Sequence, residues 1–489
     1  MIRVEATAMG SIESVDGILA GTIEPTVWSP ASSLYIASAN ERWRQSHSGD
    51  LVSGTPKNLV LSPVVIAMWR PMAEALGWPA IELGWADIAA LATSDDGWAA
   101  YGYPEWGRFK FGHTHPEFSN SGLSAVLAQA YAGAGNPRIL TSDDMAQATE
   151  LMTEIQSSLI HYGTSTGFFG ERMFDRGPSY LSAAILYENL VVAQETKRLS
   201  GQSSQLSVVA IYPKEGTFTA NHPYIILDAP WVTAEQREAA EAFQTFLLDR
   251  PQQLKALEMG FRPADVAIPF AAPLDAQHGI DTNQPRNELA APDVAALEAA
   301  TQLWRETKKP VDLVAVLDIS GSMEGDKIAS ARSSLSAFIG RLADRDRIQV
   351  IVFDDESVAM GPLSPLSDVR EDLQRRVAAI SEDGGTALYD AVGAAVSDLE
   401  ANGDPDHIRA VVVLTDGEDT ESRMDLDALL AQIGQSGEGG DSIKVFTIAF
   451  GGDASTDVLT QIAEATGARM YEGKPEDIDR VYAEIATFF

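Results

Sequence analysis

Three oxygen-bearing side chains stand at alternate positions in one short stretch of this sequence, namely Asp318, Ser320 and Ser322. They follow residues 311–317, a mostly apolar run rich in valine, which is typical of a strand buried on both faces of a parallel sheet. Open α/β sheets bind their ligands at the carboxyl ends of such strands. One carboxylate and two hydroxyls are hard oxygen ligands, the kind that Mg²⁺ prefers. The stretch therefore predicts part of a divalent-cation site.

Two segments further along the chain offer ligands of the same kind. Thr386 follows two glycines and directly precedes a segment with helical spacing. Asp416 follows residues 410–415, a second apolar run with the pattern of a buried strand. Because the chain is expected to leave a parallel sheet at its carboxyl edge at each of these points, the side chains should lie close together. The predicted metal ligands are Asp318, Ser320, Ser322, Thr386 and Asp416.

The motifs DxSxS at 318–322, GGT at 384–386 and TDG at 415–417 resemble those of the von Willebrand factor A domain. The resemblance covers residues 311–489 and implies a doubly wound, Rossmann-like α/β sheet. In that family these positions form the metal-ion-dependent adhesion site, which implies Mg²⁺, or Mn²⁺ or Ca²⁺, as the bound ion. Two carboxylates balance the charge of the ion, and one open position can accept a carboxylate from a partner protein.

Each of these side chains also has an ordinary structural explanation. Ser320 and Ser322 could cap the helix after the strand, and Thr386 could be a helix N-cap. The neighbouring acids Glu418 and Asp419 are more simply explained as part of a solvated loop. Only the complete set, in order and at strand ends, favours the metal site over these explanations.

The elements that must position this site alternate from residue 311 to the end of the chain. A mainly parallel sheet with helices on both faces is the architecture that such alternation predicts. The expected strands are 311–318, 347–353, 410–415, 442–450 and 469–471, and the expected helices are 327–342, 371–380, 387–399, 425–435, 457–466 and 475–488.

Composition narrows the classes of function. The 489 residues suggest two or three domains, and 45% hydrophobic with 21% charged residues indicates a folded globular protein. The net charge of −35 argues against binding nucleic acid and against docking on an anionic membrane. Such an acidic surface either solvates the protein or attracts cations and basic partners.

Several chemistries lack the residues they require. The chain has 0 cysteines, which excludes disulfides, zinc–thiolate sites and cysteine nucleophiles. We find no HExxH or Walker A motif, and Ser320 has no evident histidine partner, so we expect that the protein is not an enzyme. A hydrolase that uses the metal as a Lewis acid is the weakest alternative. No transmembrane run and no signal peptide are present in the sequence.

Residues 1–265 are organised differently. Residues 2–8 alternate like a strand, and residues 143–161 have the spacing of a helix. The apolar run 57–68 is interrupted by proline at position 63, where we expect it to bend or to cross between subdomains. Residues 119–122 open a helix with hydroxyls and free N–H groups, which is a ready site for an anion or a polar ligand.

The order of several short motifs in this half resembles the bacterial extracytoplasmic solute-binding proteins of the second structural type, which include molybdate and iron receptors. The motifs are GS at 10–11, TVWSPASS at 26–33, LVLSP at 59–63, FSNSG at 118–122, YPKEGT at 212–217, PYIILD at 223–228 and GFRP at 260–263. The resemblance implies a solute-binding-like domain over 1–265, with lobe one at 1–63 and 209–265 and lobe two at 64–208. A solute cleft between the lobes would be lined by Ser11, Ser29, Ser62, Ser121 and Tyr187.

Residues 266–310 read as an extended linker that ends in a short helix, ahead of the domain at 311–489. Members of the solute-binding group usually begin with a strand and a helix before the segment that matches residues 2–11, so we expect the first strand of lobe one to be absent. The resemblance also implies an extracytoplasmic location, either secreted or anchored to the envelope.

We therefore expect a divalent-metal-dependent adhesion or scaffold protein of the bacterial cell envelope, whose metal bridges to an acidic residue of a protein partner. The alternative is a solute receptor of a transport or sensory complex, in which the C-terminal domain serves as a docking module.

Overall fold

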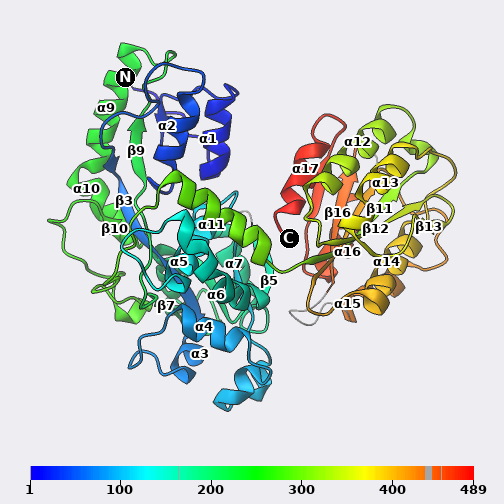
Figure 1. Ribbon diagram of the computed structural model, residues 1–489, viewed down its shortest axis with the longest axis horizontal. Helices are drawn as coiled ribbons and strands as arrows, with labels where there is room; N and C mark the ends of the chain where they lie inside the picture. Colours follow the sequence, from blue (N-terminus) through cyan, green and yellow to red (C-terminus); the bar gives the residue numbers. More distant parts are fainter. Residues whose placement is uncertain (1, 164, 436–442, 453) are drawn as a thin grey trace. The chain divides into compact units, whose positions relative to one another are not determined.

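The structure is a computed structural model that describes residues 2–163, 165–435, 443–452 and 454–489 (Figure 1). The chain divides into two compact units, residues 1–308 and residues 309–489, which we call unit one and unit two. Both units combine strands with flanking helices, so the predicted α/β fold class is confirmed.

Unit one contains a small antiparallel sheet and three helices that belong to it. Its strands, in spatial order, are β1 (Val27–Trp28), β9 (Pro223–Ile226) and β2 (Lys57–Asn58). Its helices are α1 (Ser11–Leu19), α2 (Tyr35–Trp43) and α9 (Ala234–Leu248). Helix α1 packs on α2, and α9 packs on β9.

A larger, seven-stranded sheet forms the rest of unit one. Five of its strands follow the order β10 (Arg262–Pro263), β3 (Val60–Trp69), β6 (Ala183–Tyr187), β4 (Phe111–Thr114) and β5 (Leu159–Gly163). Strands β7 (Val208–Ile211) and β8 (Thr219–Ala220) also pair with β3. The main helices around this sheet are α3 (Arg70–Ala75), α4 (Trp85–Ala92), α5 (Asn120–Gly133), α6 (Met145–Ser157), α7 (Thr166–Arg176), α8 (Glu188–Leu199) and α10 (Arg250–Glu258).

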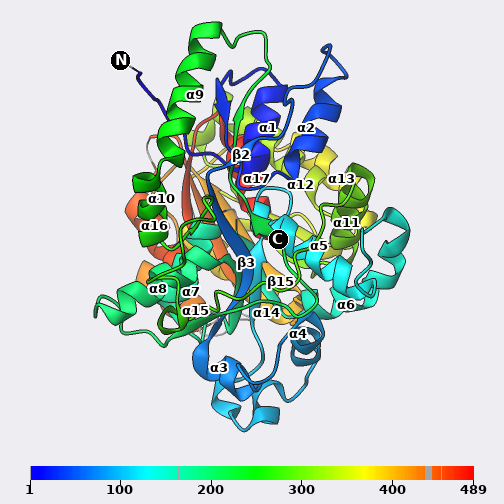
Figure 2. The same ribbon diagram turned by 90° about the vertical axis from the view of Figure 1, so that its left-hand side faces the viewer.

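Strand β3 runs through unit one from the region of α1, α2 and α9 to the region of α3 (Figure 2). Its first residues pair with β8 and β10, and from Val64 onward it pairs with β6 and β7. Pro63 stands at this change of partners and does not end the strand. The proline therefore lies where one strand connects two parts of the unit.

Two of the expected elements in unit one are wrong. Residues 2–10 form no strand, and Ile2 and Val4 are each 50% exposed, because nothing in the described chain pairs with this segment. The helix expected over 143–161 ends at Ser157, and β5 begins at Leu159. The apolar residues of β5 enter the sheet beside β4, where they are buried.

The stretch expected to be a linker contributes to unit one. Ile268, Leu274 and Ile280 are buried. Helix α11 (Val294–Thr307) packs on α5 and α6. Its Trp304 ring lies 4.7 Å from the ring of His115 and 5.4 Å from that of Tyr162.

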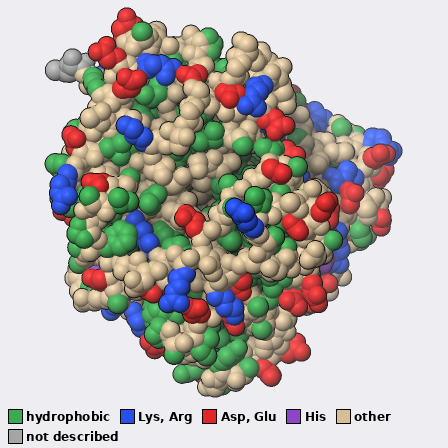
Figure 3. All heavy atoms as spheres, turned by 60° about the vertical axis from the view of Figure 1, so that its left-hand side comes forward, with side chains coloured by type: hydrophobic (Ala, Val, Ile, Leu, Met, Phe, Trp, Pro, Cys, Tyr) green, Lys and Arg blue, Asp and Glu red, His purple; other side chains and the backbone are tan. Residues whose placement is uncertain are grey.

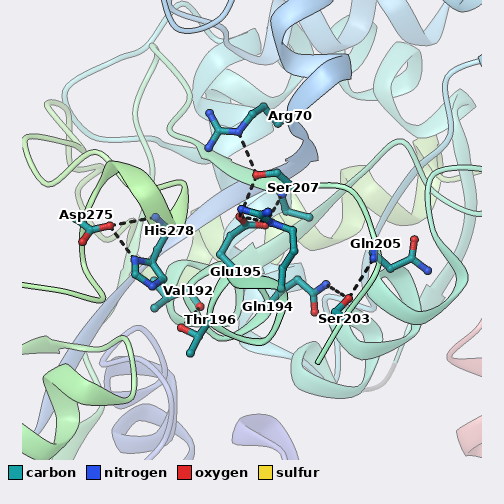
Figure 4. Close-up of polar contacts among 12 residues, drawn as sticks. Arg70, Val192, Gln194, Glu195, Thr196, Ser203, Gln205, Ser207, Asp275 and His278 are labelled. Atoms are coloured by element: carbon teal, nitrogen blue, oxygen red, sulfur yellow. Dashed lines mark hydrogen bonds and ion pairs between the residues drawn. The ribbon is translucent and has the colours of Figure 1, made fainter. Parts of the chain in front are cut away.

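Unit one contains a buried carboxylate whose two oxygens are both hydrogen-bonded (Figure 4). Glu195 of α8 is fully buried, and its Oε1 accepts a hydrogen bond from the N–H of Val208, 2.7 Å away. Its Oε2 accepts from Ser207 Oγ at 2.9 Å and from Arg198 Nε at 2.8 Å. The carboxylate therefore ties α8 to β7 without leaving an oxygen unpaired.

Unit two is a doubly wound sheet with parallel central strands. The spatial order is β13 (Ser357–Ala359), β12 (Arg347–Phe353), β11 (Val311–Asp318), β15 (Ile408–Thr415), β16 (Lys444–Phe450) and β17 (Met470–Gly473), and β14 (Ser364–Pro365) also pairs with β12. The helices are α12 (Asp326–Arg341), α13 (Leu366–Ala378), α14 (Leu388–Asn402), α15 (Leu426–Gln435), α16 (Thr456–Ala465) and α17 (Ile478–Ala486). Residue 442, at the start of one expected strand, lies outside the described residues.

All eight residues of β11 are buried, as expected for the central strand of a sheet covered on both faces. Strand β12, which follows β11 in sequence, lies on one side of it, and β15 lies on the other side. The order of the strands in the sheet therefore reverses at β11. This is the topological switch point at which open α/β sheets bind ligands.

Charged side chains of both signs lie on the face of the molecule shown in Figure 3. Acidic side chains are spread over the face shown in Figure 3 and are interspersed with basic ones. This distribution is in keeping with a solvating role for the excess of acid.

Candidate functional site

Three loops of unit two meet at the carboxyl edge of its sheet. Leu317 of β11 is paired with Leu414 of β15, which places Asp318 beside Thr415. The N–H of Gly321 donates to the carbonyl of Gly384 at 3.1 Å. The parallel register and this loop contact together bring the three predicted motifs to one place.

Three of the predicted ligands are linked by contacts between their side chains, and a fourth is reached by a backbone N–H group. Ser320 Oγ and Ser322 Oγ share a hydrogen bond of 2.9 Å, and Ser322 Oγ donates to Asp416 Oδ1 at 2.7 Å. The N–H of Ser320 donates to Asp318 Oδ1 at 2.8 Å. A Cβ placed on Gly417 would lie 3.5 Å from Thr386 Oγ1 and 3.8 Å from Ser322 Oγ, so both hydroxyls lie against this glycine. The structure therefore brings all five predicted residues together.

The two carboxylates of this group are fully buried. Burial raises the pKa of Asp318, and the charge of Asp416 adds to the shift, while hydrogen bonds from Thr415 and Ser320 oppose it. Two adjacent buried carboxylates need a positive charge to compensate them. Lys327, in the first turn of α12, supplies one, because its Nζ forms an ion pair with Asp416 Oδ2.

Lys327 is not predicted from the sequence. The residue stands five positions after Ser322 at the start of a helix, and that spacing corresponds to no ligand motif. Only the fold shows that the long side chain returns to Asp416.

The donor set consists of two carboxylates and three hydroxyls, with no nitrogen or sulfur among the predicted ligands. Such a set fits a hard divalent cation. Within the described part of the chain, no group of three or more His, Cys, Asp or Glu residues could hold a metal ion. A cation at this edge of the sheet would therefore depend on the hydroxyls as well as on the carboxylates.

The residues predicted to line a solute cleft in unit one fall into two groups. Ser121 and Tyr187 lie together at the start of α5, where Asn120 Nδ2 donates to Tyr187 Oη at 3.2 Å. Ser121 Oγ hydrogen-bonds Thr166 Oγ1 of α7 at 2.7 Å.

The other three serines are engaged elsewhere or exposed. Ser62 Oγ donates to Asn189 Oδ1 at 3.1 Å, and Ser11 Oγ accepts from the N–H of Ala31 at 3.1 Å. Ser29 is exposed. In the described structure none of the three is hydrogen-bonded to Ser121 or Tyr187.

Three buried polar atoms near Tyr187 have no hydrogen-bond partner in the described structure: Tyr35 Oη, Asn120 Oδ1 and His222 Nε2. Asn120 belongs to the polar helix start that the sequence predicts at residues 119–122. Tyr35 and His222 gave no signal, because one tyrosine in a helix and one histidine before a proline are ordinary in a sequence.

Two family models match this chain. The description "bacterial extracellular solute-binding protein" applies to residues 1–262, and "von Willebrand factor type A domain" applies to residues 312–481. Both resemblances stated above are therefore confirmed.

An uncharacterized protein of Mycobacterium tuberculosis (strain H37Rv) is 24% identical over 95% of this chain and 68% of its own length. Human inter-alpha-trypsin inhibitor heavy chain H4 is 30% identical over 37% of this chain and 20% of its own length. A solved periplasmic thiamin binding protein matches 61% of this chain and 84% of its own with 11% identity and a TM-score of 0.44. The chain thus spans about two thirds of the mycobacterial relative and a fifth of the human one.

Proposed function

Because the chain belongs to the bacterial extracellular solute-binding proteins through residues 1–262 and carries a von Willebrand factor type A domain at residues 312–481, we propose that it is a divalent-metal-dependent protein-binding protein of the bacterial cell envelope. The two domains support a role in protein interaction or binding. The observation that carries the finer proposal is the chain of contacts from Asp318 through Ser320 and Ser322 to Asp416.

Each residue of this group has a defined role in the proposal. Asp318 and Asp416 balance the charge of Mg²⁺, or of Mn²⁺ or Ca²⁺. The hydroxyls of Ser320, Ser322 and Thr386 offer neutral oxygen ligands. When bound, the ion supplies a position that an acidic side chain of a protein partner can occupy. Ser322 is exposed, so this side of the group is open to such a partner.

Lys327 occupies Asp416 Oδ2 in the structure, and a divalent ion would compete with its ammonium group for that oxygen. The lysine therefore compensates the buried carboxylates in the absence of metal. It also sets a cost on binding the ion, because the ammonium group must move or share its partner.

An extracytoplasmic location is part of the proposal, supported by the description of the family that matches the N-terminal half. None of the helices in the described part of the chain is long and apolar enough to cross a bilayer. We propose no enzymatic activity. The hydrogen bonds of Ser320 and Ser322 within the described structure involve no histidine that could act as a general base.

Calorimetric titration of the full chain with MgCl₂ and MnCl₂ tests the metal site, and capture of envelope proteins with and without EDTA tests the partner. Asp318→Ala should weaken metal binding at least about 100-fold, since loss of an outer-shell partner alone costs 10- to 100-fold. It should also abolish EDTA-sensitive capture. Asp427→Ala, which changes an exposed aspartate of α15, is the matched control. Unchanged binding by Asp318→Ala would refute the proposal.

A second candidate function is that of a solute receptor in which unit two docks unit one to a complex. One specific observation favours it, namely the three unpartnered polar atoms buried beside Tyr187 in unit one.

A further inference from the structure

The hydroxyl of Tyr187 lies where the N-termini of two helices meet. It accepts a hydrogen bond from Asn120 Nδ2, in the first turn of α5. Burial raises the pKa of Tyr187, and hydrogen bonds from Asn120, from Thr166 of α7 and from the N–H of Ser121 oppose that shift. These groups all belong to helices around the large sheet. The positive ends of α5 and α7 therefore point to one place.

Two aromatic side chains reach the same place from the part of unit one around the small sheet. Tyr35 opens α2, and its pKa is raised by burial and by the proximity of Tyr187. His222 directly precedes β9, and its ring centroid lies 6.4 Å from that of Tyr187. We call Tyr35, Asn120, Tyr187 and His222 the cleft cluster, after the solute cleft that the sequence predicts at Tyr187.

The cleft cluster holds the three unpartnered atoms Tyr35 Oη, Asn120 Oδ1 and His222 Nε2. Tyr35 and Asn120 are only 6% and 2% exposed. A buried polar atom without a partner destabilises the folded state, so native proteins rarely keep several of them together. The fully bonded Glu195 in the same unit shows the usual arrangement (Figure 4). Three such atoms around one tyrosine point to a bound molecule that completes them.

The cleft cluster carries no net charge. Burial lowers the pKa of His222 to about 4, so its ring is neutral at pH 7. Glu188 directly follows Tyr187 in the chain, and Arg262 neutralises its charge: Arg262 Nε donates to Glu188 Oε1 at 2.8 Å and Arg262 Nη2 to Glu188 Oε2 at 2.6 Å. No unpaired guanidinium or ammonium group is thus supplied by these residues to a bound anion.

We propose that the cleft cluster binds a small uncharged molecule bearing several hydroxyl groups, a polyol or a monosaccharide. A hydroxyl both donates and accepts, so it can donate to Asn120 Oδ1, an obligatory acceptor, while its oxygen accepts from Tyr35 or from a helix N–H group. Sulfate and molybdate carry no donor and would leave Asn120 Oδ1 unsatisfied. The rings of Tyr187 and His222 offer apolar faces to the C–H groups of such a molecule. This inference rests on the second candidate function and is independent of the metal site.

Thermal unfolding and calorimetry of the full chain with glucose, ribose and myo-inositol test the ligand class, with sodium sulfate and sodium molybdate as the competing class. At least one of the three polyhydroxy compounds should bind and raise the Tm, and neither oxyanion should do so. Binding of sulfate or molybdate would leave solute reception intact but overturn the proposed class. Failure of all three polyhydroxy compounds to bind overturns the proposal as well.

Variants separate a ligand contact from a structural role. Tyr35→Phe removes a hydroxyl that has no partner in the described structure, so the unliganded Tm should stay the same or rise. The same change should weaken binding of the polyhydroxy compound about tenfold, and Asn120→Leu should weaken it by a similar factor. Tyr101→Phe, at a tyrosine that is 41% exposed, should change neither quantity.

A clear fall in the unliganded Tm of Tyr35→Phe would mean that its hydroxyl is already bonded within the protein, and it would overturn the proposal even before a ligand is found. Asp318→Ala should leave binding of the polyhydroxy compound unchanged, which separates a failure of this inference from a failure of the metal site.

Discussion

The two candidate sites of this chain differ in whether their polar groups are bonded within the protein. At the edge of the unit two sheet, the candidate ligands bond to one another, and Lys327 pairs with Asp416. In the cleft cluster of unit one, three buried atoms are left without a partner. The chain alone completes the first site, whereas the second is complete only with another molecule. A ligand should therefore compete with internal contacts in unit two and add missing contacts in unit one.

The difference follows from how each site is built. Asp318 and Asp416 stand at the ends of neighbouring strands of one sheet, and the register of those strands brings them together. The contact of Gly321 with Gly384 adds the loop that carries Thr386. The cleft cluster joins side chains from the surroundings of two different sheets. Side chains that meet only through tertiary packing need not offer equal numbers of hydrogen-bond donors and acceptors. A ligand can bond to the donors and acceptors that are left without a partner.

The largest effect that separates the units should be their response to acid. His113 and His222 of unit one have pKa values lowered to about 4, because burial disfavours their charged forms. Since the unfolded chain has the higher pKa, the unfolded state binds more protons below pH 6.5, and stability falls as the pH drops from 6.5 towards 4. Each histidine should contribute up to about 3 kcal/mol to this loss.

Unit two should show no such loss in that interval. Its His407 is bound to Asp312, and the pKa of Asp312 is lowered, so the stability from that carboxylate is lost only as the pH falls below its ordinary value. Denaturant unfolding of the full chain at pH 7 and pH 5 measures the contrast. His113→Gln and His222→Gln together should reduce the response of unit one without abolishing it, because burial also lowers the pKa of His115. The exposed His47→Gln is the control. Equal loss in both units would contradict the assignment.

The second prediction concerns the ion pair between Lys327 and Asp416 in unit two. Lys327→Met removes the ion-pair partner of Asp416, which is buried together with Asp318, and we expect the free energy of unfolding in EDTA to fall by about 2–3 kcal/mol. Millimolar Mg²⁺ should restore that loss, and the affinity for Mg²⁺ should rise about tenfold because the ion no longer competes with the ammonium group.

Denaturant unfolding and calorimetry measure these two quantities. Lys474→Met, at an exposed lysine of the same unit, serves as the control and should change neither. If Lys327→Met is destabilised equally with and without Mg²⁺, then the lysine and the ion do not share the site.

How far the sequence predicts each site depends on the same contrast. Asp318, Ser320 and Asp416 could be predicted as neighbours, because buried apolar runs identify parallel strands and parallel strands end at a common edge. Lys327 could not, because the direction of a long side chain at a helix start depends on packing. The cluster at the start of α5 was predicted through Ser121 and Tyr187.

Tyr35 and His222 complete that cluster from the part of unit one around the small sheet. No local sequence pattern indicates that these two residues reach Tyr187. The wrong elements have a similar cause. The alternation in residues 2–8 is typical of a strand, but a strand also requires a neighbour to pair with. The apolar residues 159–163 fit either a helix end or a short buried strand, and periodicity does not distinguish the two.

The smallest expected effect makes the comparison sharpest, because it applies one chemical change to both sites. Thr415 Oγ1 donates to Asp318 Oδ2 and is fully buried, so Thr415→Val deletes a hydroxyl that is bonded. Loss of this hydroxyl should lower the free energy of unfolding by about 1–2 kcal/mol and weaken the binding of Mg²⁺ about tenfold. Tyr35→Phe deletes a hydroxyl that is not bonded, and it should cost nothing in the unliganded protein.

The two substitutions are compared in one denaturant series in EDTA, with Tyr101→Phe as the exposed control. Both remove one buried hydroxyl and leave the apolar packing in place, so a general sensitivity to lost polarity would destabilise both. Destabilisation by Thr415→Val alone is the result expected if the polar groups of the unit two site are bonded within the protein and those of the cleft cluster are not. Equal losses would mean that Tyr35 Oη has a partner inside the folded chain, and the contrast between the sites would then disappear.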